Sequence, residues 1–191
     1  VLVQQRAYAQ ANDLLTPIVP DRITTDQAYR LFFLRGQIHL GLQEHQEAVV
    51  DLRAAVTQGE GLNDVEYIER ARNLLGKAYF LLYNYTLAME HHIRCYNAIE
   101  HGQIADPVFA LELYNNLAND YFRLGDLEKA ITFYHRALGT LDGLNRDAKG
   151  FAEKYMEIGK SYKALGKVTM ARDYLMRSLA IYEMCDEQRL E

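Results

Sequence analysis

Apolar and small residues recur at helical spacing along the chain, and short polar breaks separate the segments that carry this pattern. The breaks are rich in glycine, proline and aspartate, which end helices and form turns. They lie at Pro20-Asp21, Gly59 to Gly61, His101-Gly102 with Asp106-Pro107, and Gly143 to Asn145. The pattern predicts helices over 3–18, 25–41, 45–58, 63–83, 86–101, 108–124, 128–142, 148–165 and 169–186. The first of these has a weak point near 9–12, at which it could break.

One register of residues repeats within these helices and is clearest in the third quarter of the chain. The positions that define it are Tyr114, Leu117, Ala118, Tyr121, Gly125, Ala130, Tyr134 and Ala137. The tetratricopeptide pattern has an aromatic residue, two residues, Leu-Gly, two residues and Tyr, and later Ala, three residues and an aromatic residue. The match is close, with Ala118 in place of the glycine.

The same register returns in the other helix pairs. Alanines on the second helix stand at Ala48, Ala88, Ala130 and Ala171, which are 40 to 42 residues apart. Small residues on the first helix stand at Gly36, Gly76, Ala118 and Gly159. We expect both sets to let the paired helices approach closely, while larger side chains fill the remaining space at high density. Gly125 and Gly166 are expected to end first helices, and Asp126 to begin the next helix.

The period of about 41 residues exceeds the usual tetratricopeptide period of about 34. The sequence therefore resembles the long-period tetratricopeptide proteins, such as kinesin light chains, Pins-type polarity adaptors and the sensor domains of many bacterial regulators. The resemblance covers roughly residues 26–185 and implies an all-α fold, a right-handed α-solenoid of antiparallel helix pairs. We expect one array over 1–191, made of a half repeat at 1–22 and repeats at about 25–60, 63–103, 107–145 and 148–187.

The concave surface of such an array is its usual binding face, and the first helix of each pair lines it. Asparagines gather there, although asparagine is a mediocre helix former. Because an amide offers a donor and an acceptor together, it can pair with the backbone of an extended peptide, and asparagines at matching positions do so in long-period families. The predicted peptide-binding residues are Asn73, Lys77, Asn115, Asn116, Asn119, Phe122, Arg123 and Lys160. The bland alternative is that the asparagines cap helices or are solvated.

Composition and motifs exclude several other classes. The net charge of −5 disfavours direct binding of nucleic acid, which needs a basic face. No apolar run is long enough to span a membrane, and no signal peptide opens the chain, so we expect a cytoplasmic protein. His91, His92 and Cys95 share one helical stretch, but two of them occupy packing positions, so we predict no metal. No catalytic motif is present, so we predict neither an enzyme nor a cofactor.

Two functions fit these observations. The resemblance to bacterial helix-turn-helix regulators implies a peptide-sensing or oligomerisation domain, and the alternative is a general scaffold without a switch. The chain begins with Val rather than Met, so we expect it to be part of a longer protein. The last helix carries Leu175, Met176, Leu179 and Tyr182, and no polar capping helix follows. Either the native chain continues or this end forms a homodimer, unless Leu175 and Leu179 pack inward and leave a tolerable stripe.

Overall fold

The computed structural model describes residues 2–144 and 148–187, and these form α-helices, one short 3-10 helix and no strand. The chain divides into two compact units, Val1–Ala105 and Asp106–Glu191. The first unit holds α1 (Leu2–Leu15), the 3-10 helix Pro20–Arg22, α2 (Thr25–Leu42), α3 (His45–Leu62), α4 (Val65–Leu81) and α5 (Tyr85–Glu100). The second holds α6 (Pro107–Leu124), α7 (Leu127–Gly143), α8 (Ala148–Ala164) and α9 (Val168–Glu187). Each of the last four predicted repeats contains one helix pair.

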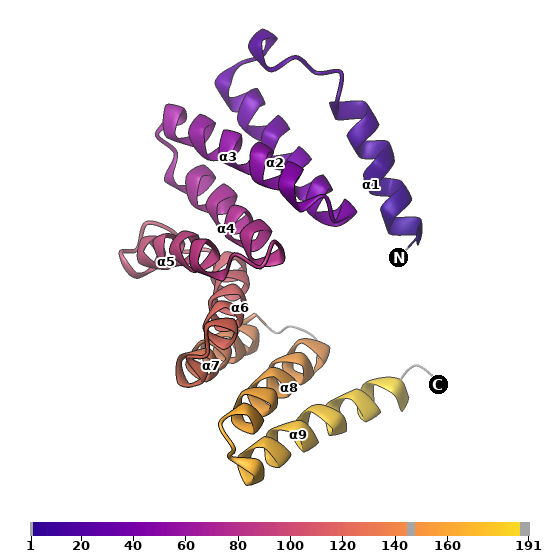
Figure 1. Cartoon of the computed structure of the whole chain (residues 1–191), viewed down its shortest axis with the longest axis vertical. Helices are drawn as coiled ribbons and strands as arrows, with labels where there is room; N and C mark the ends of the chain where they lie inside the picture. The colour runs from indigo at the N-terminus through magenta and orange to yellow at the C-terminus, as the bar shows by residue number, and fades with distance from the viewer. Residues whose placement is uncertain (1, 145–147, 188–191) are drawn as a thin grey trace. The chain divides into compact units, whose positions relative to one another are not determined.

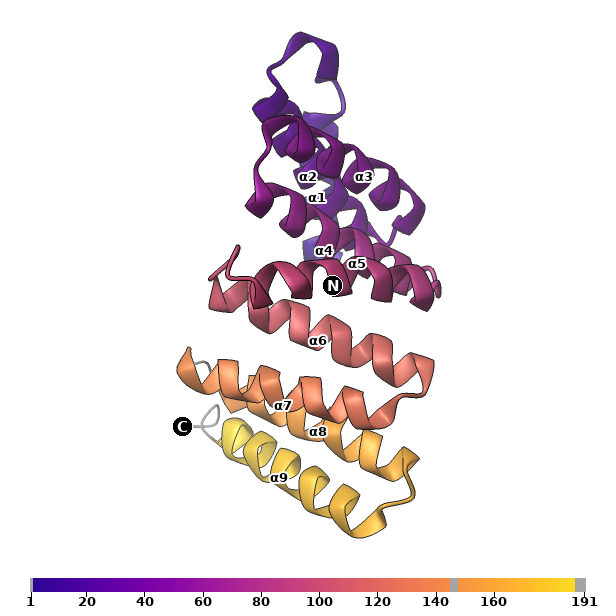
Figure 2. The same ribbon diagram turned by 90° about the vertical axis from the view of Figure 1, so that its left-hand side faces the viewer.

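Within each unit, consecutive helices pack against one another. In the first unit α1 packs on α2, α2 on α3, α3 on α4, and α4 on α5 (Figure 1). In the second unit α7 packs on both α6 and α8, and α8 packs on α9, so the helices follow one another in chain order (Figure 2). This is an all-α solenoid, as the sequence predicted.

Close approach between paired helices occurs at the predicted small residues. A Cβ atom added to Gly36 would lie 2.5 Å from Cγ of Leu52, and one added to Gly159 would lie 2.8 Å from Cγ of Leu175. At Gly76 the added atom would lie 2.5 Å from Nε2 of His92. These distances leave no room for a methyl group without movement of the neighbour. The prediction that these glycines serve packing is confirmed.

One residue at or just after the end of each first helix is in the left-handed conformation, seven residues after the small residue of the register. The φ angles are 66° at Gln43, 62° at Tyr83, 87° at Gly125 and 73° at Gly166. Glycine adopts this conformation at little cost, and the two predicted glycine stops are confirmed. Asp126 then begins α7, because its side chain accepts a hydrogen bond from the Lys129 N–H, as a good N-cap residue does.

Two helix predictions were wrong. Helix α1 runs unbroken through 9–12 and ends at Leu15 rather than at residue 18, because Pro17 disfavours helical geometry at the residue before it. Helix α3 continues to Leu62 through both glycines that were expected to end it. Gly59 is buried there, and an added Cβ would lie 3.1 Å from the backbone nitrogen of Ile68 in α4. The small size of Gly59 therefore lets α3 and α4 pack closely. The chain turns later, at Asn63.

Candidate functional site

The asparagines of α6 lie on one face of the second unit, and one of them is held by a buried tyrosine. The hydroxyl of Tyr134 in α7 donates to Oδ1 of Asn119, with 2.6 Å between the oxygens. Tyr134 is only 1% exposed, and burial raises the pKa of its phenol, so it stays a neutral donor. With Oδ1 occupied, the Asn119 amide group is oriented and its N–H bonds point elsewhere.

Two more asparagines precede this contact on α6. Asn115 and Asn116 are both half-buried. Oδ1 of Asn115 is a buried oxygen without a hydrogen-bond partner among the described residues. Buried polar atoms normally have partners, because an unmade hydrogen bond costs about 1–3 kcal/mol. The three amides therefore give this stretch of α6 an unusually polar, half-buried surface.

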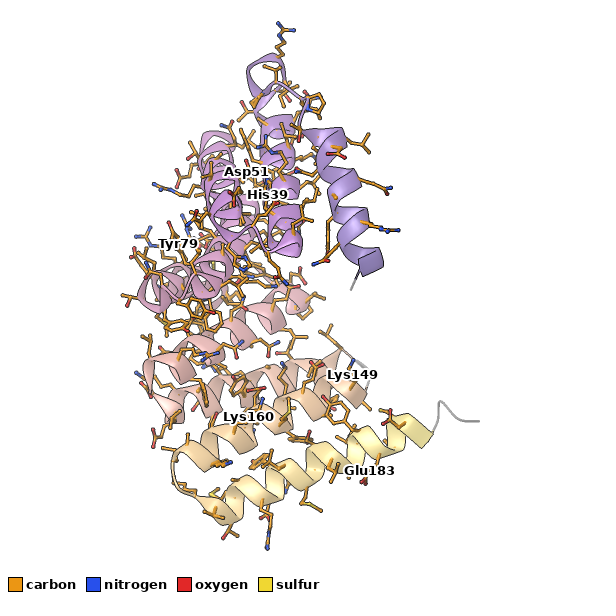
Figure 3. The ribbon with its side chains drawn as sticks, turned by 45° about the vertical axis from the view of Figure 1, so that its right-hand side comes forward. His39, Asp51, Tyr79, Lys149, Lys160 and Glu183 are labelled. Carbon is orange, nitrogen blue, oxygen red and sulfur yellow. The ribbon has the colours of Figure 1, made fainter. Side chains whose placement is uncertain are left out.

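One charged side chain from α6 and one from α8 act electrostatically on the Tyr134 hydroxyl. Burial is the largest cause of the raised pKa of Tyr134, and the negative charge of Glu157 is the second largest. The positive charge of Arg123 acts to lower this pKa. Glu157 accepts a hydrogen bond from Lys160, with 2.7 Å between Oε1 and Nζ. Lys160 is exposed on α8 (Figure 3). In the second unit, one buried hydroxyl thus contacts an amide and feels charges of both signs.

The predicted residues of the first unit are placed differently. Lys77 is exposed on α4, but Asn73 is 2% exposed and lies in the core. The Asn73 carbonyl oxygen is 3.1 Å from Nε2 of His92, so this part of α4 faces α5. A buried amide does not reach a ligand in the groove, and we leave Asn73 out of the site proposed below.

Sequence reasoning missed Tyr134 as part of this site. It was assigned only to the repeat's packing register, where Tyr134 follows Ala118 at the same spacing at which Leu52 follows Gly36. The signal was the residue type, since a tyrosine at a fully buried position needs a partner for its hydroxyl. The remaining predicted residues, Phe122 and Arg123, are half-buried and exposed respectively.

The histidines and cysteine of α5 belong to the core. His92 and Cys95 are buried, and the Cys95 thiol donates to the carbonyl oxygen of Glu69 at 3.4 Å. Burial raises the pKa of this thiol, so it stays protonated and packs as a small apolar group. His91 stacks on Tyr79 with ring centroids 5.4 Å apart. Among the described residues, no group of three histidine, cysteine, aspartate or glutamate side chains is arranged to hold a metal ion.

The first unit also contains an open apolar pocket that the sequence did not predict. Its volume is about 250 Å³, and its lining residues are Leu15, Ile18, Ile23, Gln27, Leu31 and Leu34. These residues come from the end of α1, the segment that follows it, and α2. None of the helices in the described part of the chain is long and apolar enough to cross a lipid bilayer.

Comparison with known proteins agrees with this architecture. The family model for the tetratricopeptide repeat matches residues 109–184, which lie in the second unit. None of the curated proteins compared with the chain matches it.

Solved structures resemble the fold over nearly the whole chain. BtubC from P. vanneervenii is 17% identical, with a TM-score of 0.76 over 94% of this chain and 72% of its own. A MamA structure described as AMB-1 is also 17% identical, with a TM-score of 0.67 over 95% of this chain and 94% of its own. A Rap protein complexed with competence and sporulation factor is 18% identical, with a TM-score of 0.74 over 91% of this chain but only 48% of its own. The fold is therefore that of tetratricopeptide-like solenoids.

Proposed function

We propose that the chain is a protein interaction module whose second unit binds an extended peptide along α6. The observation that carries this proposal is the hydrogen bond from Tyr134 to Asn119, which fixes an amide at the half-buried surface. A preorganised amide loses little freedom when it binds, and such preorganisation favours affinity. The tetratricopeptide match covers the same unit, and tetratricopeptide arrays bind ligands along the helices that bear these asparagines.

The proposed contact is made with the ligand's backbone. Tyr134 occupies Oδ1 of Asn119, so the Asn119 amide donates its N–H bonds to a peptide carbonyl. Asn116, less than one turn earlier, adds a second amide on the same side of α6. Backbone pairing of this kind accepts many sequences, so the flanking charges of Arg123, Glu157 and Lys160 select among them.

We further propose a sensing or oligomerisation role for the chain, in a bacterial, cytoplasmic regulator. The Rap structure supports this proposal, because that protein was solved in complex with a competence and sporulation factor. A general scaffold is the second candidate, because the tetratricopeptide match and the all-α solenoid support protein interaction without requiring a switch. A scaffold would keep one conformation with and without its peptide, whereas a sensor would change shape or assembly.

A peptide array probed with the purified chain tests the proposed site. We expect the Asn116→Ala/Asn119→Ala variant to bind selected peptides about 1–3 kcal/mol more weakly, or roughly 5-fold to 150-fold. The Tyr134→Phe variant keeps the ring in the core but frees the Asn119 amide, so we expect a smaller loss in the same direction. The matched control is Asn97→Ala, an exposed asparagine of α5 in the other unit. Equal affinity of the control and the double variant would remove α6 from the site.

A further inference from the structure

Helix α9 carries an apolar stripe that, among the described helices, α8 covers only in part, because Leu175 packs on Gly159 while Met176 and Leu179 stay exposed. Leu175, Met176 and Leu179 are 37%, 57% and 48% exposed. The same positions of α7, one repeat earlier, are Tyr134, His135 and Leu138, and of these Tyr134 and Leu138 are buried. The difference follows from the packing, because α7 lies against both α6 and α8, whereas α9 packs on α8. Leu175 packs against Gly159 of α8, as the inward alternative expected, whereas Leu179 remains 48% exposed.

Charges on this face are arranged symmetrically about Leu179. Arg172 precedes Leu179 by seven residues and Asp186 follows it by seven, with Glu183 one turn closer. Seven residues are close to two helical turns, so these side chains lie on the same side of α9 as Leu179. All three charged residues are exposed, and none makes an ion pair with another residue that the structure describes. Glu183 is labelled on α9 in Figure 3.

We propose that this face docks on the same face of a second copy of the chain, with the two α9 helices antiparallel about a twofold axis at Leu179. In that arrangement Leu179 meets its counterpart, Met176 meets Tyr182, and Arg172 of each copy meets Asp186 of the other. A twofold interface must be self-complementary in this way. An apolar centre with an arginine at one end and carboxylates at the other satisfies that requirement.

The pairing is expected to be weak. One helix from each copy buries less surface than the roughly 1,200–2,000 Å² of stable complexes. We therefore expect only weak self-association, through a surface on α9 that is separate from the proposed peptide site on α6. Such a contact would let the chain respond to its own concentration.

Sedimentation of the chain over about 5–500 μM tests the proposal, with the range set by the expected weak interface. We expect a monomer–dimer equilibrium, and we expect Leu179→Glu to shift the dissociation constant at least about tenfold, since it places two carboxylates together at the axis. Met184→Glu is the matched control, because Met184 is also 48% exposed but lies on another side of α9. Circular dichroism checks that each variant keeps its helices. A monomer throughout the range, or equal effects of the two substitutions, would overturn the proposal.

A charge reversal tests the antiparallel register. Arg172→Glu alone and Asp186→Arg alone should each weaken the dimer, because each places like charges opposite one another. The double variant restores both pairs with reversed sign and should recover most of the affinity. If the double variant is as weak as the single ones, the register about Leu179 is wrong.

Discussion

Helix pairs α2–α3 and α6–α7 share one register, yet they fill one position of it with opposite chemistry. In α6–α7 the position holds Tyr121 and Phe133, whose rings stack with centroids 5.5 Å apart. In α2–α3 it holds His39 and Asp51, whose Nε2 and Oδ2 atoms lie 3.3 Å apart (Figure 3). Arg35 forms an ion pair with the same carboxylate, with 3.2 Å between its Nε and Oδ2 of Asp51. One backbone arrangement therefore accepts either a ring stack or a buried ionic network.

The two solutions differ in what burial does to them. Removal of ring surface from water stabilises the aromatic pair directly. Burial instead raises the pKa of Asp51, although Arg35 and His39 both act to lower it. A raised pKa means that the ionised carboxylate is less favourable in the folded chain than in water. The network in α2–α3 therefore holds its members together without repaying the full cost of their burial.

The largest expected effect comes from breaking this network at its centre. Asp51 is 2% exposed and faces both Arg35 and His39. Asp51→Ala leaves those two groups without their shared partner, so we expect a loss of about 3 kcal/mol, near the lower end for buried pairs because Arg35 is partly exposed. Urea unfolding followed by circular dichroism measures it, with the exposed Asp142→Ala as control. A loss below about 1 kcal/mol, within the range for surface pairs, would mean that water already screens the network.

Replacing the ionic network by the aromatic pair should stabilise the chain, whereas Asp51→Ala should destabilise it. Arg35, His39 and Asp51 correspond in register to Leu117, Tyr121 and Phe133. The triple variant Arg35→Leu/His39→Tyr/Asp51→Phe replaces the ionic network by the side chains of α6–α7, and we expect stability from unchanged to about 3 kcal/mol higher. The same urea measurement decides the sign.

The control for the transplant keeps one charge in place. His39→Tyr/Asp51→Phe without the change at Arg35 leaves a guanidinium beside two rings and without its carboxylate. We expect this double variant to be less stable than the triple variant. If the triple variant is clearly less stable than the native chain, the α2–α3 interface is shaped for its polar residues, and the shared register does not make the two pairs interchangeable.

The register shared by these helix pairs could be predicted from the sequence, because close helix packing requires small residues at regular positions. Small residues recur at 40 to 42 residues wherever two helices meet closely, and Gly36 and Gly159 lie against Leu52 and Leu175 as that pattern predicts. The contacts of individual side chains could not be predicted from the sequence. Asn73 was placed in the groove by its register, but it is buried. Gly59 was expected to end α3, but it packs against Ile68. Such outcomes depend on how helices face one another, which residue type alone does not encode.

The smallest expected effect concerns the helix pair α4–α5, which combines an aromatic ring with a titratable one at this position. Its pair at this position is Tyr79 stacked on His91, with a titratable ring in place of Phe133. Burial is the main reason that the pKa of His91 is lowered from its ordinary 6.5 to about 4, and the positive charge of Arg72 is the second reason. The unfolded chain therefore binds a proton at higher pH than the folded chain does. The stability associated with neutral His91 is fully present above about pH 6.5 and is lost as the pH falls toward 4.

His91→Phe should remove this pH dependence while it keeps the stack. We compare the free energies of unfolding of the variant and the native chain. From pH 7 to pH 5 we expect their difference to shift by about 1 kcal/mol in favour of the variant, after allowance for partial exposure of the ring. Thermal unfolding at pH 7, 6 and 5 measures the difference, and His101→Phe at an exposed position serves as control. A constant difference between His91→Phe and the native chain across this range would mean that water reaches the ring. In that case the α4–α5 position would behave like a surface site, and burial in this register would differ between repeats as much as chemistry does.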